Sequence, residues 1–183
     1  MGPSDGELME RWRKGDPTAF EELVRRWHPA IARLLGRLAG PRGLIPDLCQ
    51  EVFVRVYQAR SRYRENGAFA GWIYQIALNV ARDADRRRRD VLPLPEEEVP
   101  SETASAEAVC QERELTAAVR QALAELPEPQ RVVLVLHHYE KMNFEQIARL
   151  TGTPASTLKS RFAAAIGRLR TRLGQLGWGP EET

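Results

Sequence analysis

The sequence predicts an all-α protein with two small helical domains joined by an acidic flexible linker, the C-terminal domain carrying a helix-turn-helix. Apolar residues recur with helical spacing on both sides of residues 91–106, and no segment shows the alternation of a half-buried strand. Residues 91–106 hold three prolines among acidic and small polar residues and have no helical period, which is typical of a linker. We therefore expect domains over residues 6–90 and 107–174.

In the first domain we expect three helices. Asp16 and Pro17 form a helix start, with the aspartate as N-cap and the proline in the first turn, and Pro29 is expected to bend this helix. Residues 40–43 end it. Further helices are expected over residues 46–60 and 68–89, separated by a polar loop at 61–67.

The second domain should begin with a helix over residues 107–125 and, after a proline-containing break, continue with a helix ending near Tyr139. Helices over 143–150 and 154–173 follow, with a turn at Gly152 between them and Thr153-Pro154 starting the last one. This spacing is that of a helix-turn-helix.

The last helix should bury one apolar stripe and expose a basic side. Residues 151–173 carry five basic residues and no acid. Charge alone would favour a solvated helical hairpin, but the helix pair, the turn chemistry and the absence of acids together favour DNA binding. The candidate DNA contacts are Ser156, Thr157, Lys159, Ser160, Arg161, Arg168 and Arg170.

The helix over 68–89 carries a second polar line. Gln75, Asn79, Arg82 and Arg86 follow one another at helical spacing and lead into four consecutive arginines, so the line suits bases and phosphates, or is a solvated helix end. Tyr63 in the preceding loop could offer a stacking surface.

The helix over 46–60 is acidic on one side. Asp47, Gln50, Glu51 and Val54 share this face, which repels phosphate and suits either a basic protein partner or water.

Charge is unevenly distributed along the chain. The formal net charge is +2, but residues 90–114 hold eight acids and one arginine, so the remainder carries +9. Basic flanks around an acidic strip indicate a polyanionic partner, or a merely solvated surface. The N-terminus does not resemble a signal peptide, and no apolar run is long enough for a membrane helix. Cys49 and Cys110 match no disulfide framework, so we expect a cytoplasmic protein.

No constellation predicts catalysis, a cofactor or a metal site. His137 and His138 have no accompanying ligands at a useful spacing, and no phosphate-binding loop, nucleophile elbow or zinc motif occurs. We therefore expect a protein that is not an enzyme.

Several segments resemble, in order and spacing, the signatures of bacterial extracytoplasmic-function (ECF) RNA polymerase sigma factors. They are DLCQEVFVRVY (47–57), FAGWIYQIALN (69–79), LPEPQR (126–131), FEQIA (144–148) and TLKSR (157–161). The resemblance implies an alternative-type sigma factor that binds RNA polymerase core, directs it to −35/−10 promoters and assists melting. The alternative is a stand-alone helix-turn-helix regulator using only the second domain.

The resemblance also implies residue roles. Asp47, Gln50, Glu51 and Val54 would contact a basic coiled coil of the largest polymerase subunit, and the last helix would bind the −35 element. The first domain would also bind the −10 element, and an anti-sigma factor is an expected further partner. The implied −10 contacts are Tyr63, Arg64, Asn66, Gln75, Asn79, Arg82 and Arg86.

The chain departs from the family pattern at residues 163–166. Basic contacts common in the family are replaced there by Ala163, Ala164, Ala165 and Ile166. We expect this helix to position the protein on phosphates and to read shape, leaving discrimination to residues 63–66 and Asn79.

Overall fold

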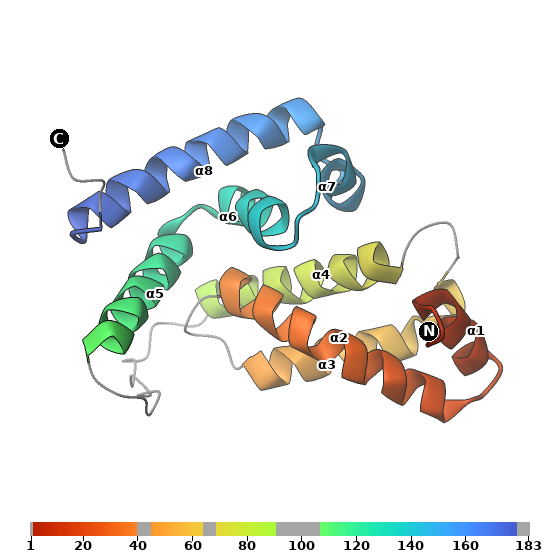
Figure 1. Cartoon of the computed structure of the whole chain (residues 1–183). Helices are drawn as coiled ribbons and strands as arrows, with labels where there is room; N and C mark the ends of the chain where they lie inside the picture. Colours follow the sequence, from red (N-terminus) through yellow and green to blue (C-terminus); the bar gives the residue numbers. More distant parts are fainter. Residues whose placement is uncertain (1, 40–44, 64–68, 91–106, 179–183) are drawn as a thin grey trace.

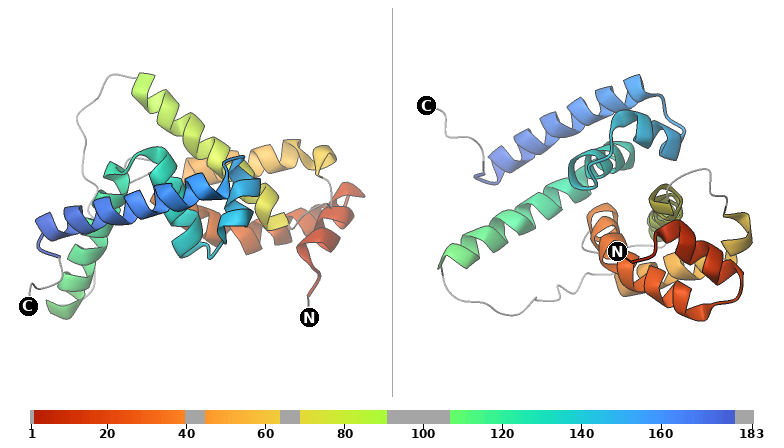
Figure 2. Two further views of the ribbon diagram at one scale, coloured as in Figure 1. Left: turned by 90° about the horizontal axis from the view of Figure 1, so that it is seen from above. Right: turned by 45° about the vertical axis from the view of Figure 1, so that its right-hand side comes forward.

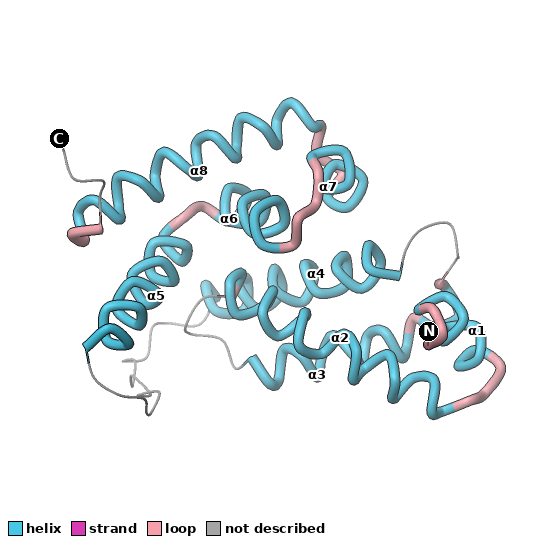
Figure 3. The backbone as a smooth tube through the Cα atoms, viewed as in Figure 1, coloured by secondary structure: helices cyan, strands magenta, loops and turns pink. Residues whose placement is uncertain are grey.

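In the computed structural model, the described residues are 2–39, 45–63, 69–90 and 107–178, and they form helices and connecting loops without a strand (Figure 3). This part of the chain is all-α and divides into two helical domains, as the sequence predicts. No helix within these ranges combines the length and apolar character needed to cross a membrane.

The first domain contains α1 (Asp5–Arg13), α2 (Pro17–Leu38), α3 (Ile45–Gln58), a 3-10 turn η1 (Arg60–Arg62) and α4 (Phe69–Asp90). The bounds of α2, α3 and α4 lie within two residues of the predicted ones, and α2 continues through Pro29 without interruption. Asp16 caps α2, accepting a hydrogen bond from the Thr18 backbone N–H at 3.0 Å. Hydrogen bonds from the Thr18 side chain and from Arg11 lower the pKa of Asp16 to about 2.

Helix α1 was not predicted from the sequence. Ser4 and Glu7 begin this helix as a capping box, in which each side chain accepts a hydrogen bond from the other residue's backbone N–H, at 3.2 and 2.6 Å. Leu8, Met9 and Trp12 then bury its apolar side. The capping-box pattern was present in the sequence and would have revealed the helix.

The second domain contains α5 (Glu107–Glu125), α6 (Glu128–Leu134), a π-helical turn η2 (Val135–Tyr139), α7 (Phe144–Thr151) and α8 (Ala155–Gln175). The helix predicted to end near Tyr139 therefore changes to π-helical pairing in its last turn. Gly152 adopts φ of 68° and ends α7, a conformation that glycine reaches without a steric penalty. The pair α7 and α8 is the predicted helix-turn-helix.

The two domains pack directly against each other. Figures 1 and 2 show α6 and α7 between α8 on the outside and α2 and α4 of the first domain. A single cluster of buried apolar side chains crosses the boundary, joining Leu34 and Leu35 of α2 to Val133, Leu136 and Ile147 of the second domain. A smaller cluster around Leu123, Leu134 and Ala165 lies inside the second domain.

Two valines of α3 test this distribution of burial. Val52 is 0% exposed and Val54 is 46% exposed. We expect Val52→Ala to lower the free energy of unfolding by about 2 kcal/mol, because two buried methyl groups are lost and a cavity remains. Val54→Ala, the matched control, should change it by less than about 0.5 kcal/mol. Equal effects of the two substitutions in urea denaturation would contradict the placement of α3.

Candidate functional site

The predicted acidic face of α3 is exposed to solvent. Asp47, Gln50 and Val54 are exposed and Glu51 is half-buried, while the opposite side of the helix packs into the core. The helix therefore presents a surface with carboxylates at its edge and an exposed valine within it.

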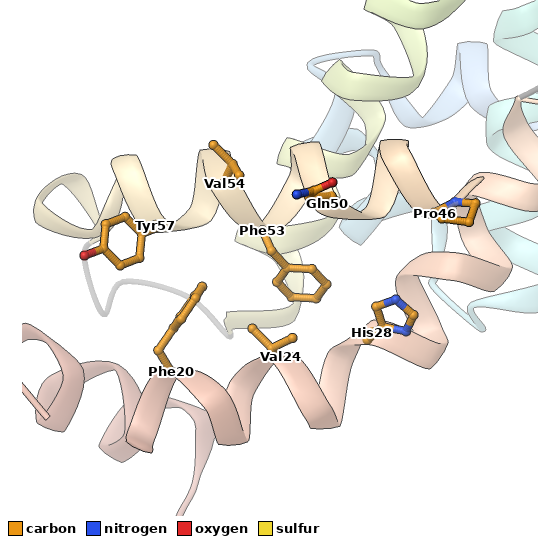
Figure 4. Close-up of a pocket in the computed structure, with 8 residues that line it drawn as sticks. All are labelled: Phe20, Val24, His28, Pro46, Gln50, Phe53, Val54 and Tyr57. Carbon is orange, nitrogen blue, oxygen red and sulfur yellow. The ribbon is translucent and has the colours of Figure 1, made fainter. Parts of the chain in front are cut away.

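An apolar groove of about 370 Å³ runs beside this face, between α2 and α3. Figure 4 shows Phe53 and Tyr57 of α3 pointing toward Phe20 and Val24 of α2. Gln50 and Val54 line the groove and also belong to the acidic face, so the two features form one continuous surface. A partner here would meet apolar contacts in the groove and negative charge along its edge.

Tyr57 lines this groove, although it lies on the apolar side of α3 together with the core residues. It is 52% exposed, and its ring lies 5.6 Å from both Trp12 and Phe20. Helical periodicity puts Tyr57 on the apolar side of α3 but does not show that a groove between α2 and α3 leaves it half exposed. The cluster with Trp12 depends on α1, which the sequence analysis did not predict.

A network of ion pairs connects the acidic face to α4. Glu51 accepts hydrogen bonds from Arg55 at 2.5 Å and from Arg87 at 3.0 Å, and Arg55 also bonds to Asp83 at 2.9 Å. Burial alone would raise the pKa of Glu51, but the hydrogen bonds and charges of Arg87 and Arg55 outweigh it and lower this pKa. The Glu51 carboxylate therefore belongs to the acidic face of α3 and also forms an ion pair with Arg87 of α4.

The polar line on α4 is exposed along its length, as predicted. Gln75 and Asn79 make no side-chain hydrogen bond to the described part of the chain. Arg82 donates from Nε to Glu128 of α6 at 3.0 Å, and Arg86 pairs with Asp83 at 3.4 Å. The two amides are therefore available to a ligand, whereas both arginines already have carboxylate partners.

The loop before α4 is described only in part. Tyr63 is 4% exposed, with its ring 5.1 Å from Trp72 and 6.0 Å from Phe69 in edge-to-face packing. Stacking of a base on Tyr63 thus requires the ring to leave this aromatic cluster. Arg64 and Asn66 lie outside the described residues.

The outer side of α8 has the predicted character. Leu158 and Ala165 are buried, whereas Ala163, Ala164 and Gly167 are exposed. Ser160 donates its hydroxyl hydrogen to the Ser156 carbonyl oxygen at 3.2 Å, so this hydroxyl already has an internal partner. Of the candidate contacts, Thr157 and Arg161 are half-buried and the others are exposed, namely Ser156, Lys159, Ser160, Arg168 and Arg170.

His137 packs inside the second domain, whereas the neighbouring His138 is exposed. His137 stacks on Phe144 with ring centroids 4.4 Å apart, and its Nδ1 lies 2.8 Å from the Met142 carbonyl oxygen. Within the described residues, no group of three potential metal ligands occurs. Cys49 is a buried free thiol whose pKa is raised by burial.

Two family models match the chain. Sigma-70 region 2 matches residues 23–91, which include all of α3 and α4, and Sigma-70, region 4 matches residues 116–169, which include α7 and most of α8. The fold and these surfaces thus define an RNA polymerase sigma factor.

Two relatives with similar sequences show to which group of sigma factors the chain belongs. The chain is 34% identical over 173 residues to the ECF RNA polymerase sigma-E factor of Escherichia coli strain K12, covering 88% of this chain and 90% of that protein. It is 32% identical over 176 residues to the RNA polymerase sigma-H factor of Pseudomonas aeruginosa, covering 88% and 89%. The chain belongs to the ECF sigma factors, which bind RNA polymerase core and direct transcription initiation at promoters.

Two solved structures share the fold. CnrH, solved in complex with the cytosolic domain of CnrY, aligns with a TM-score of 0.71 at 23% identity, covering 94% of this chain and 99% of that chain. The sigma factor RpoE of Bartonella quintana, solved with the anti-sigma factor NepR, aligns with a TM-score of 0.67 at 20% identity, covering 85% and 96%.

The ion-pair network predicts a pH-dependent contribution to stability. The lowered pKa of Glu51 means that its pairs stabilise the fold above the unfolded-state value of 4.5 and are lost as pH falls through the folded-state pKa. We expect Glu51→Gln to lower the free energy of unfolding by about 0.5 kcal/mol at neutral pH, because the pairs are partly solvated.

The difference in free energy of unfolding between Glu51→Gln and the original chain should shrink once the pH falls below 4.5. The exposed Glu21 on α2 provides a control, since Glu21→Gln removes a carboxylate that makes no ion pair with the described residues. Denaturation measured across this pH range tests the assignment. A difference for Glu51→Gln that stays constant down to the lowest pH would contradict it.

Proposed function

We propose that this sigma factor binds core polymerase through α3 and promoter DNA through α4 and α8, without catalysing a reaction of its own. Residues 6–90 would form the region 2 domain, 91–106 the linker and 107–174 the region 4 domain. The site of action would be the cytoplasm, because bacterial polymerase and chromosome meet there. The observation that carries the proposal is the exposed acidic face of α3 beside an apolar groove.

Core polymerase would bind this combined surface. Asp47, Gln50 and Val54 are exposed, and the groove provides apolar area for side chains of a partner helix. A basic coiled coil, which the family resemblance implies in the largest polymerase subunit, matches both features. Glu51 would then exchange its bond with Arg87 for a bond to the polymerase.

The −10 element would bind along α4. Gln75 and Asn79 offer exposed amides that can both donate to and accept from the edge of an unstacked base. Unstacking a base costs a few kcal/mol, and these contacts would offset part of that cost. Arg82 and Arg86 would hold the backbone, and Tyr63, Arg64 and Asn66 would complete the base pocket.

The −35 element would bind α8, with Ser156, Thr157 and Ser160 near the start of the helix. Lys159, Arg161, Arg168 and Arg170 would hold phosphates. Because Ala163, Ala164 and Gly167 are exposed between these groups, the helix can approach the duplex closely but has few side chains that reach base edges. Shape would therefore supply most of the selectivity at −35.

An anti-sigma factor is the proposed regulatory partner. CnrH and RpoE of Bartonella quintana were each solved with a partner, named as an anti-sigma factor for RpoE. In this chain the groove between α2 and α3 offers such a partner an accessible apolar surface. Occupation of the groove would exclude core polymerase from the adjoining acidic face.

Reversal of one charge tests the docking surface. We expect Asp47→Arg to weaken core-polymerase binding by about tenfold or more, because a close charge pair becomes repulsive. Glu145→Arg, which reverses an exposed acid on α7, is the matched control and should have a much smaller effect. Binding measured by fluorescence anisotropy separates these outcomes. If Asp47→Arg leaves the affinity for core polymerase unchanged and the chain binds duplex DNA without polymerase, the protein would instead act as a stand-alone regulator.

Asn79→Ala tests the base pocket. We expect open-complex formation to fall by about tenfold, because an amide lost from a base contact costs roughly 1–3 kcal/mol, while core binding stays unchanged. Core affinity and promoter melting are measured on the same preparation, so that each serves as a control for the other. An equal loss of core affinity and of promoter melting would contradict a base-binding role for Asn79.

A further inference from the structure

We propose that His137 is a positioning residue for promoter binding, because its ring fixes Lys159 of α8 where Lys159 meets a phosphate of the −35 element. This inference rests on the proposed role of α8. His137 lies in η2, before the helix-turn-helix, and acts on both of its helices through packing.

The His137 ring contacts both helices of the helix-turn-helix. It stacks on Phe144, the first residue of α7, with ring centroids 4.4 Å apart and ring planes 19° apart. It also meets Phe162 of α8 edge-to-face, with centroids 4.8 Å apart. Phe144 and Phe162 are themselves 5.9 Å apart. Because aromatic pairs prefer such stacked and edge-to-face arrangements, the three rings fix how α7 and α8 meet.

A hydrogen bond fixes the orientation of this ring. His137 Nδ1 lies 2.8 Å from the Met142 carbonyl oxygen, and a carbonyl can only accept, so Nδ1 carries the hydrogen and donates it. The Met142 backbone N–H donates in turn to the Leu136 carbonyl at 3.1 Å. Met142 directly precedes Asn143, the N-cap of α7. The same bonds therefore hold the imidazole ring and the start of α7.

His137 belongs to a π-helical turn. The Glu140 backbone N–H donates to the Val135 carbonyl, five residues earlier, at 3.2 Å. Such turns are rare and occur frequently at functional sites. A π-helical turn is wider than an α-helical one, so it changes the direction of the side chains that it carries. The direction of His137 is therefore a property of this turn.

Lys159 depends on the same three rings. Its Nζ lies 6.0 Å from the centre of the Phe144 ring, within reach of a cation–π contact. Along α8, Lys159 precedes Phe162 by one helical turn, so its backbone is also held by a ring that His137 contacts. A lysine side chain loses much rotamer freedom on binding, and a side chain that is already positioned loses less.

His138 provides a matched control. It is the next residue of the chain and is exposed, and its ring packs edge-to-face on Tyr139 of the same turn, with centroids 4.8 Å apart. His138→Ala therefore removes the same side chain while leaving the His137, Phe144 and Phe162 rings in place.

The test uses the holoenzyme formed from core polymerase and the full chain, at about pH 8, where an ordinary histidine is neutral. Its probe is a duplex that the original holoenzyme has enriched from a pool randomised in the −35 region. Lys159→Gln should weaken binding about tenfold and lower the log–log salt slope by about 0.9, the loss of one phosphate contact. His137→Ala should reproduce both changes, although it removes no positive charge from the protein.

Two further comparisons separate positioning from a general loss of structure. Combining His137→Ala with Lys159→Gln should weaken binding no more than either substitution alone, because both remove the same contact. His137→Phe keeps a stacked ring and should retain the original salt slope and an affinity within about twofold. His138→Ala should do the same.

The outcomes separate this inference from the proposed function. The positioning role is refuted, with the proposed function of α8 intact, if His137→Ala binds like the original chain, loses affinity at an unchanged salt slope, or adds in full to Lys159→Gln. His137→Phe behaving like His137→Ala would also refute it. If Lys159→Gln itself changes neither quantity, the proposed phosphate contact fails, and the positioning role with it. If His137→Ala is unfolded by circular dichroism, His137→Leu, which fills the space without a planar ring, replaces it in every comparison.

Discussion

The packing of α6, η2 and α7 against α2 and α4 is the interaction on which the arrangement of the whole molecule depends. These elements are short, and a short helix buries too little apolar surface to be stable alone. Val133, Leu136 and Ile147 become fully buried only because α8 covers one side of this layer and the first domain covers the other. The position of the helix-turn-helix relative to α4 follows from this shared core.

Electrostatics reinforces the same arrangement and connects it to function. The chain places carboxylates on two arginines of α4, with Glu51 on Arg87 and Glu128 on Arg82, and Arg82 is one of the proposed DNA contacts. Each of these acids also belongs to another surface, the proposed polymerase-docking face of α3 for Glu51 and the interdomain contact for Glu128. Binding of polymerase at α3 would therefore change the availability of arginines on α4. This links the two surfaces by a direct exchange of partners.

Much of this fold could be predicted from the sequence because the long helices have clear periodicity. The ends of α2 and α7 carry local signals, an aspartate cap and a glycine with positive φ, that identify them without tertiary information. The exposure of the tyrosines could not be predicted in this way. Tyr63 follows η1, where no helical period applies, and its burial depends on Phe69 and Trp72. The pair formed by Arg82 and Glu128 joins residues 46 positions apart, so no local pattern predicts it.

The central claim is the proposal that core polymerase docks on the acidic face of α3 beside the apolar groove. A photo-reactive cross-linker placed at position 54, which is exposed on α3 and lines the groove, measures this directly, with the same cross-linker at the exposed position 145 on α7 as a control. We predict cross-links to the largest polymerase subunit from position 54 and none to that subunit from position 145. No cross-link to that subunit from position 54, or equal yields from both positions, would contradict the claim.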